Sequence, residues 1–244
     1  SIVTDVVEKL FGITLHVTTV SRLLRRMGIT PQKPVRRAFQ RDEEEIVRWT
    51  TQEFPGIVRS AKRQQATLLF ADETGVHEDG PIGTTWGARG ETPIVTLSGT
   101  RRRINVISAV SPRGRLWFRC YQGSLTAPRF VAFLEALLQD VRGRIVLIMD
   151  RHPAHNAALV RRFIRLQKGR IQVHCLPGYA PDLNPDEHVW SALKGLFRRD
   201  PLGPEEQIEP SVNRAMNAIA ADRSWVKSFF EHPDVAYVRD ALNW

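Results

Sequence analysis

Hydrophobic and polar positions change their pattern near residue 66. Before it, apolar residues recur every three or four positions, which is typical of helices with one buried face. This spacing predicts helices over residues 3–12, 17–27 and 41–66, with a break in the third at Pro55. After residue 66, short unbroken apolar runs predict strands that are buried on both faces.

The second region alternates strands with helices. The predicted strands cover residues 67–74, 104–110, 116–121, 145–150 and 171–176, with a twisted hairpin at 86–89 and 93–96. One predicted helix begins near residue 127, and the others cover 157–167, 185–199 and 204–230. Antiparallel strands followed by alternating helices and strands predict an α/β fold with a mixed sheet flanked by helices.

Two of these strands end on an aspartate, Asp72 and Asp150. A third acid, Glu187, follows Asn184 and Pro185, which suit the start of a helix. Three converging carboxylates repel one another unless cations lie between them, and this arrangement holds Mg²⁺ for phosphoryl chemistry. The alternative is that each aspartate caps a strand and the glutamate caps its own helix.

The first two predicted helices have the helix-turn-helix pattern, in which the second helix reads DNA. Its apolar stripe is Val20, Leu23, Leu24 and Met27. The residues left to face DNA are Thr18, Thr19, Ser21, Arg22, Arg25 and Arg26. A basic linker or wing follows at residues 29–40, where Lys33, Arg36 and Arg37 are placed to run along phosphates. The alternative is an ordinary helical hairpin.

Charge favours the DNA-binding interpretation. The 244 residues carry a net charge of +9, and residues 101–119 hold six arginines and no acid. Clustered arginine favours a polyanionic partner, usually nucleic acid. No apolar run approaches the length of a membrane span, so no membrane partner is expected. We divide the chain into residues 1–40 (helix-turn-helix with basic linker), 41–65 (helical connector), 66–202 (catalytic domain) and 203–244 (helical segment).

Other polar residues lie near the predicted acids. Glu73 and Asp79 are interpreted as loop acids. His152 and His155 have a spacing found in zinc sites, but no cysteine or second histidine pair completes such a site. His155 and Asn156 either contact DNA and orient water and ligands beside the acids, or lie on the surface.

Three segments resemble the catalytic motifs of DDE transposases, most closely those of the bacterial insertion-sequence branch of the Tc/mariner superfamily. They are residues 72–75 (DETG), 150–155 (DRHPAH) and 176–190 (LPGYAPDLNPDEHVW). Residues 83–87 and 109–114 are also similar to that family. The second motif often has asparagine after its aspartate, where this chain has Arg151. Members usually carry another helical DNA-binding element upstream, so we expect one before Ser1.

The resemblance implies an RNase H-like (retroviral-integrase-like) core preceded by a helix-turn-helix (winged-helix-like) domain. Asp72, Asp150 and Glu187 would be the catalytic and metal-binding residues, holding two Mg²⁺ ions with Mn²⁺ as a substitute. His155, Asn156 and Asn184 would support them. The implied function is cut-and-paste DNA transposition, by a homodimer that acts on inverted-repeat transposon ends and typically on a TA target. The implied location is the bacterial cytoplasm, in association with the nucleoid.

Three other functions compete with this one. A hydrolase of RNA–DNA hybrids would share the core, but hybrids are not read by a major-groove helix. A DNA-binding regulator or an inactive transposase-derived protein would bind DNA without cutting it, although the presence of all three acids argues against loss of activity. A purely structural module would leave the acids amid an arginine-rich surface unexplained.

Overall fold

The computed structural model describes residues 2–32, 38–80, 82–96, 102–203 and 205–242. Its contacts divide the chain into two units, Ser1–Ala38 and Phe39–Trp244. The finer boundaries predicted near residues 41, 66 and 203 lie within the second unit. The two units are described separately below.

The first unit contains helices α1 (Ile2–Phe11) and α2 (Val17–Arg26), as the sequence predicts. Within the expected stripe of α2, Val20 is buried, but Leu23 and Met27 are 44% and 72% exposed. The prediction that these two side chains are buried is therefore wrong. The physical reason is size, because two short helices cannot enclose a complete apolar stripe.

The second unit begins with one continuous helical segment rather than a helix that breaks at Pro55. Helix α3 (Glu43–Arg48) passes through a π-helical turn, η1 (Trp49–Glu53), into α4 (Phe54–Arg63). The amide of Phe54 donates to the carbonyl of Trp49, five residues back. This wider turn immediately before Pro55 accommodates a ring that an α-helix interior tolerates poorly, so the chain continues without a break.

A five-stranded mixed sheet forms the centre of the second unit, with strand order β3-β2-β1-β4-β5. Its strands are β1 (Thr67–His77), β2 (Arg103–Ser111), β3 (Arg115–Tyr121), β4 (Ile145–Met149) and β5 (Ile171–Cys175). Strands β1, β2 and β3 pair antiparallel, while β1, β4 and β5 run parallel. The predicted succession of antiparallel and then alternating elements is confirmed.

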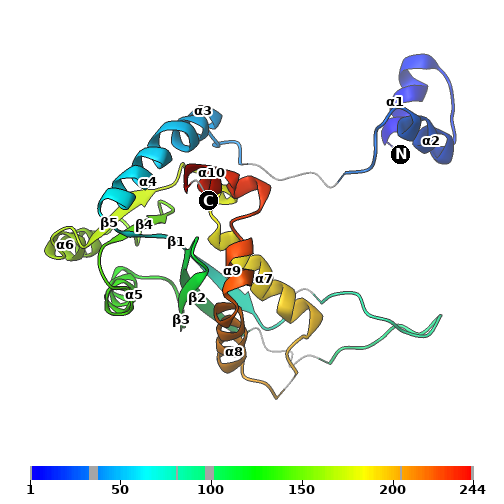
Figure 1. Ribbon diagram of the computed structural model, residues 1–244. Helices are drawn as coiled ribbons and strands as arrows, with labels where there is room; N and C mark the ends of the chain where they lie inside the picture. The colour runs from blue at the N-terminus through cyan, green and yellow to red at the C-terminus, as the bar shows by residue number, and fades with distance from the viewer. Residues whose placement is uncertain (1, 33–37, 81, 97–101, 204, 243–244) are drawn as a thin grey trace. The chain divides into compact units, whose positions relative to one another are not determined.

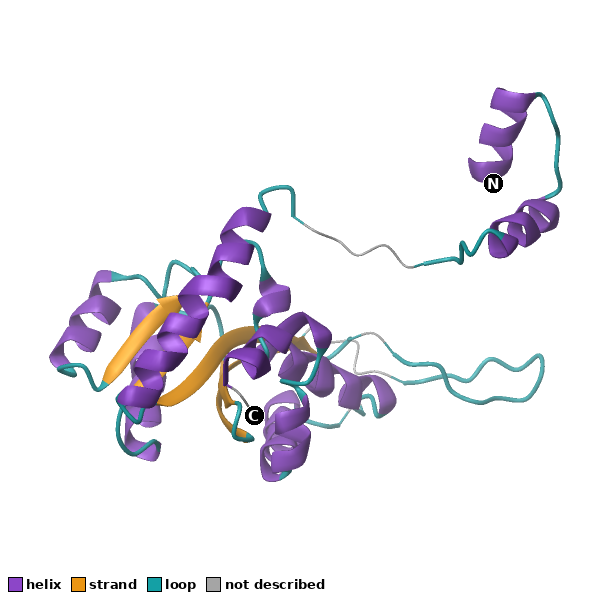
Figure 2. Cartoon of the chain, turned by 45° about the horizontal axis from the view of Figure 1, so that its top comes forward, coloured by secondary structure: helices purple, strands orange, loops and turns teal. Residues whose placement is uncertain are grey.

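Helices cover both faces of this sheet (Figure 1, Figure 2). On one face, α5 (Ala127–Asp140) and α6 (Ala158–Leu166) pack against Leu69 and Ala71 of β1. On the other face, α4, α7 (Asp186–Arg199) and α8 (Ile208–Ala221) enclose Leu68 and Phe70. Because side chains alternate along a strand, residue 72 continues the second face and residue 73 continues the first.

Short elements close the second face. They are the 3₁₀ turns η2 (Pro181–Leu183) and η3 (Pro233–Val235), and the helices α9 (Arg223–Ser228) and α10 (Ala236–Leu242). Buried Val226, Val235 and Val238 from this C-terminal region join the larger core. Among the described residues, no helix is long and apolar enough to cross a membrane.

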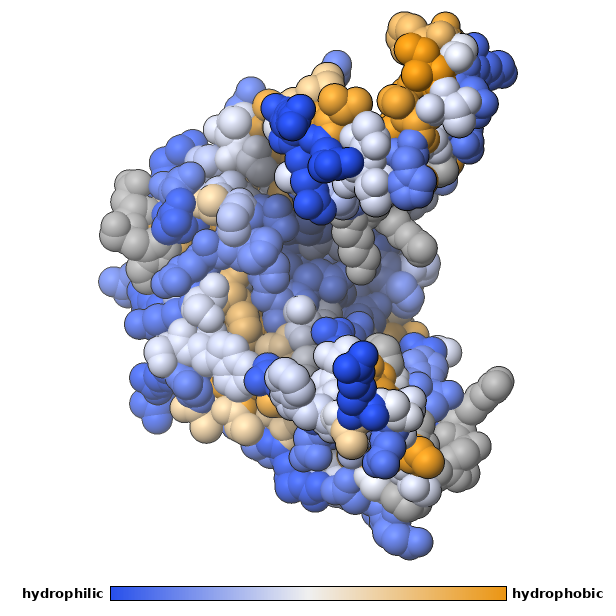
Figure 3. Space-filling model, turned by 90° about the vertical axis from the view of Figure 1, so that its right-hand side faces the viewer, coloured by the Kyte–Doolittle hydropathy of each residue, from blue (hydrophilic) through white to orange (hydrophobic). Residues whose placement is uncertain are grey.

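Residues 82–96, between β1 and β2, extend away from the sheet (Figure 1, Figure 2). The predicted hairpin strands at 86–89 and 93–96 are wrong, because residues 82–96 contain a turn but no strand. Trp86 and Ile94 are almost fully exposed there. Strands that lack a packed face are marginal, and this segment has no core to pack against. Hydrophilic side chains cover most of the molecular face in Figure 3, with small hydrophobic groups between them.

Candidate active site

Asp72 lies inside β1, on the sheet face covered by α7. Its Oδ2 accepts a hydrogen bond from Nε1 of Trp190 at 3.1 Å, and its Oδ1 accepts one from the Glu73 amide at 2.8 Å. Trp190 is 2% exposed, so its indole is fixed by packing in the core. The carboxylate of Asp72 is therefore held in one orientation by a strand amide and a buried ring.

Asp150 follows the last residue of β4. The parallel pairing of β1 with β4 ends where Phe70 lies opposite Ile148, two residues before Asp72 on one strand and two before Asp150 on the other. The Oδ1 atom of Asp150 accepts from the His152 amide at 3.0 Å and lies 2.9 Å from Nδ1 of His155. Both aspartates thus follow the paired part of two neighbouring parallel strands, and their convergence stays a prediction.

Glu187 stands in the first turn of α7, and Asn184 fixes the position of that turn. The Asn184 side chain donates to the carbonyl of Ala71 at 3.1 Å and accepts from the amide of Asp186 at 3.2 Å. The helix begins at Asp186, one residue after the predicted start. A buried amide therefore joins the start of α7 to β1, directly beside Asp72.

Two contacts hold the turn that precedes α7. Arg41, whose side chain is 8% exposed, forms a bidentate pair with Asp182 at 2.5 and 3.0 Å. The hydroxyl of Tyr237 donates to the carbonyl of Leu183 at 2.8 Å. Residues from the two ends of the second unit thus hold η2, the turn that precedes Glu187 in the chain. Sequence reasoning did not identify these contacts, because sequence separations of 141 and 54 residues leave no local pattern.

Asp186 is fully buried beside these acids and was not predicted as a functional residue. Its two carboxylate oxygens accept from the Ser108 hydroxyl of β2 at 2.7 and 2.8 Å. Burial, and then repulsion from Asp72, raise the pKa of Asp186 well above its usual value. The contact ties α7 to a second strand of the sheet.

Burial opposes ionisation of the two acids on the α7 face, Asp72 and Glu187. Burial, followed by the charge of Glu187, raises the pKa of Asp72 from 3.8 to about 8. Burial also raises the pKa of Glu187. Carboxylates whose ionisation is opposed in this way become fully charged when a cation neutralises them.

The environment of Asp150 has the opposite effect. Burial acts to raise the pKa of Asp150, but its interactions with His155 and the His152 amide outweigh burial and lower it. Burial acts to lower the pKa of His155, but Asp150 and Glu73 outweigh burial and raise it from 6.5 to about 9. Asp150 is therefore ionised near neutral pH and is oriented by a charged imidazole.

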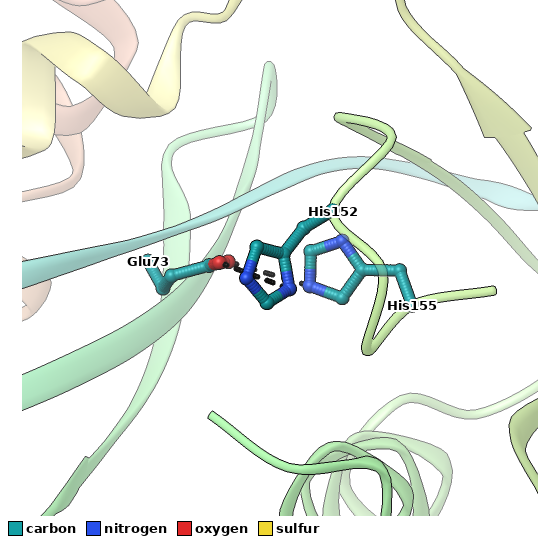
Figure 4. A group of neighbouring side chains, drawn as sticks. All are labelled: Glu73, His152 and His155. Carbon is teal, nitrogen blue, oxygen red and sulfur yellow. Dashed lines mark ion pairs between the residues drawn. The ribbon is translucent and has the colours of Figure 1, made fainter. Parts of the chain in front are cut away.

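Glu73 belongs to β1 rather than to a loop, so its predicted placement is wrong. It projects from the face opposite Asp72 and meets His155, with 3.3 Å between its Oε2 and Nε2 of the imidazole. Its Oε1 lies 3.8 Å from Nδ1 of His152. Figure 4 shows the two imidazoles next to the glutamate. The predicted strand over 67–74 already contained Glu73, and side-chain alternation along it could have assigned this face.

The structure brings Asp72 and Glu187 together, while the contacts of Asp150 are with histidines. Asp72 and Glu187 are close enough to repel, whereas Asp150 turns toward His155. Among the described residues, one group of potential ligands has atoms all within 4.8 Å of one another, and it consists of Glu73, His152 and His155.

The remaining predicted residues have varied environments. Asn156 is exposed and its side-chain oxygen accepts from Arg161, while Arg151 pairs with Glu45 of α3. In α2, the side chains of Thr18, Arg22, Arg25 and Arg26 are exposed, and those of Thr19 and Ser21 are half-buried. The basic residues Lys33, Arg36 and Arg37 lie outside the described residues.

The pKa shifts predict how stability depends on pH without metal. Because the pKa of Asp72 is raised on folding, its contribution to the free energy of unfolding is fully present below about pH 4 and is lost as pH rises through about 8. The contribution that follows from the raised pKa of His155 is fully present below about pH 6.5 and is lost as pH rises through about 9. We expect urea denaturation in a chelator to show the free energy of unfolding falling by roughly 1–3 kcal/mol across this window. Asp72→Asn should flatten the curve, and an unchanged curve would contradict the assignment.

Comparison with known proteins identifies similar sequences and similar folds. The Tc1 transposase of Caenorhabditis elegans is 26% identical over 196 residues, covering 72% of this chain and 67% of that protein. A Mos1 transposase paired-end complex with the left transposon end has a TM-score of 0.69 at 14% identity, covering 98% of this chain and 73% of that one. A Mos1 paired-end complex with Mg also has a TM-score of 0.69, at 18% identity and the same coverage. The predicted fold, a mixed RNase H-like sheet flanked by helices with an N-terminal helix-turn-helix, is confirmed.

Two family models match the chain. A winged helix-turn-helix model matches residues 1–53. The DDE superfamily endonuclease model matches residues 67–208, which include all five strands, Asp72, Asp150 and Glu187. Because this second match covers more than half of the chain, the protein belongs to the DDE superfamily of endonucleases.

Proposed function

We propose that this protein is a DNA transposase that cuts transposon ends and joins them to target DNA, with Asp72, Asp150 and Glu187 as its catalytic triad. The observation that carries the proposal is that Asp72 lies close enough to Glu187 to feel its charge, while Asp150 directly follows the strand that pairs with β1. The Asn184 side chain supports this by joining the start of α7, which bears Glu187, to the carbonyl of Ala71 beside Asp72. The whole arrangement lies in the segment matched by the DDE endonuclease family.

The donor set fits Mg²⁺. Carboxylate oxygens are the ligands that this hard cation prefers. The charge of Glu187 opposes ionisation of Asp72, and a bound cation would offset that repulsion. The Mos1 complex solved with Mg has the same fold. Two bound Mg²⁺ ions, with Mn²⁺ as a substitute, would activate the attacking water or 3′-hydroxyl and stabilise the leaving oxygen.

The side chains around the acids have positioning roles in this proposal. Trp190 and the Glu73 amide orient Asp72. His155 and the His152 amide both engage Oδ1 of Asp150, and the proposal assigns its other oxygen to a metal ion. Pre-orientation matters because a ligand displaced by about 1 Å can reduce the rate roughly 100-fold.

The substrate and assembly are proposed from the similar proteins. The Mos1 titles name a paired-end complex and a transposon end, so we infer that this chain also brings two inverted-repeat ends together as a homodimer. Its target would be TA, as in the Tc/mariner superfamily. Within that superfamily we place it in the bacterial insertion-sequence branch, which implies action on DNA in the nucleoid.

A joining assay tests the proposed reaction. The protein, its candidate transposon ends and a supercoiled target plasmid are incubated with Mg²⁺, and the junctions are sequenced. We expect end cleavage followed by insertions at TA. Cleavage without joining would limit the function to an endonuclease, and insertions without a TA preference would contradict the proposed target.

The exposed arginines of α2 carry a prediction about DNA binding. Replacing Arg22 and Arg25 together by alanine should weaken binding and reduce the slope of log affinity against log salt by about 2, if both contact phosphates. Lys9→Ala on α1 is the matched control, because Lys9 is also exposed. Equal slopes for the double variant and the control would mean that α2 does not contact DNA.

The alternative function is a DNA-binding regulator or an inactive transposase-derived protein. It is favoured only by the amino-terminal helix-turn-helix match and the positive charge. In that case Asp150→Asn would leave DNA affinity unchanged, and neither the variant nor the original protein would cut DNA in the joining assay.

A further inference from the structure

We propose that Glu73, His152 and His155 form a second metal site, which binds a borderline transition-metal ion such as Zn²⁺ or Co²⁺ and is separate from the three-acid centre. The cluster lies on the sheet face opposite Asp72 and joins β1 to the loop after β4. It provides two imidazoles and one carboxylate, a ligand set that suits Zn²⁺ and other transition metals better than Mg²⁺.

The distances between the side-chain atoms of Glu73, His152 and His155 are compatible with ligands that share one ion. Nε2 of His155 lies 3.3 Å from Oε2 of Glu73, and Nδ1 of His152 lies 3.8 Å from Oε1. Two atoms that each lie about 2.1 Å from one ion are roughly 3.0–3.5 Å apart in tetrahedral or octahedral geometry. The first observed separation lies within this range and the second exceeds it, so the His152 ring would move closer to Glu73 when an ion binds.

Burial supplies a second, independent observation. The side chain of His155 is only 4% exposed, yet neither ring nitrogen makes an aligned hydrogen bond. Oε2 of Glu73 is also buried without an aligned partner. Asp150 accounts for Nδ1, which leaves Nε2 of His155 and Oε2 of Glu73 facing each other at 3.3 Å, and an ion between them would replace the proton on Nε2.

The surroundings of His155 resemble those of a metal-binding histidine. While Nε2 faces Glu73, Nδ1 lies 2.9 Å from Asp150. Histidines that bind metal usually present their other nitrogen to a carboxylate, which fixes the ring. Asp150 would thus contact both centres, directly in the three-acid site and through His155 in the second site.

His152 and the adjoining cleft complete the site. Nδ1 of His152 accepts a 3.2 Å bond from the Ala154 amide, so this nitrogen carries a lone pair for which an ion would compete. The side chain of His152 is 40% exposed. It lines a cleft of about 450 Å³ together with Glu73, Asn105 and Tyr121, which gives an ion a path from solvent.

Cobalt titration tests the proposal. Co²⁺ is added to the full-length protein in excess Mg²⁺, and its visible absorption band reports nitrogen ligands. We expect one equivalent of Co²⁺ to bind. His152→Ala or Glu73→Gln should weaken Co²⁺ binding by at least about 10–100-fold, because losing even a residue that only supports a ligand has an effect of that size. The matched control is His77→Ala, an exposed histidine at the end of the same strand. Zn²⁺ should displace the cobalt.

The outcomes separate this site from the proposed catalytic function. Asp72→Asn and Glu187→Gln should keep the cobalt band even if they abolish DNA cleavage. Because His152 is partly exposed, His152→Ala should keep its melting temperature without metal, and His152→Asn provides a second variant. Absence of a band in Mg²⁺, or equal affinity in the His152 and Glu73 variants, would overturn the proposal and leave His155 as an imidazolium between two carboxylates.

Discussion

Asp150→Asn, Asp72→Asn and Glu187→Gln are each expected to reduce metal-dependent DNA cleavage by at least about 1,000-fold, a loss of about 4 kcal/mol in transition-state stabilisation. Each change removes one negative charge and keeps the shape of the side chain. The reaction would lose a metal ligand while the fold is retained. Initial rates of end cleavage under single-turnover conditions measure the effect directly.

The matched control is Asp79→Asn. Asp79 is exposed in the turn after β1, seven residues from Asp72. This variant should cut DNA at the normal rate, and all four variants should bind DNA with normal affinity. If the triad variants retain activity, the cleavage centre lies elsewhere. If a triad variant also loses DNA binding, its rate loss does not identify a ligand.

Trp190→Ala is expected to destabilise the second unit by about 3–5 kcal/mol. The side chain is 2% exposed between α7 and the sheet, and its removal leaves a large cavity beneath the acids. Many domains are stable by only about 5–15 kcal/mol, so much of that margin would be lost. Urea denaturation followed by circular dichroism gives the free energy of unfolding.

Two variants separate packing from hydrogen bonding at this position. Trp190→Phe keeps an aromatic ring but removes the donor to Asp72, so we expect a smaller loss of stability and a clear reduction in cleavage rate. Trp86→Ala is the exposed control and should leave the free energy of unfolding unchanged, since Trp86 is 99% exposed. Equal stability of Trp190→Ala and Trp86→Ala would contradict the role given to the buried indole.

Local pattern carried most of the fold prediction. The apolar runs ending at Asp72 and Asp150 identified two strands, and Asn184 with Pro185 identified the start of α7 to within one residue. These elements can be predicted from the sequence because their patterns depend only on residues that are close together along the chain. The hairpin between β1 and β2 was wrong because aromatic and β-branched residues suggest strands even where there is no core to pack on.

The contacts that shape the site depend on tertiary structure instead. The hydrogen bond from Trp190 to Asp72 and the pair between Arg41 and Asp182 each span more than 100 residues. Glu73 was assigned to a loop because it lies beyond the apolar run that ends at Asp72. Only the structure shows that the opposite face meets His155.

Anomalous scattering from Mn²⁺ in crystals of the DNA-bound protein tests the central claim most directly. The account predicts Mn²⁺ bound by the carboxylates of Asp72, Asp150 and Glu187, and loss of that signal in Asp150→Asn. An active, DNA-bound protein with ordered Mn²⁺ but none on these three carboxylates would contradict it.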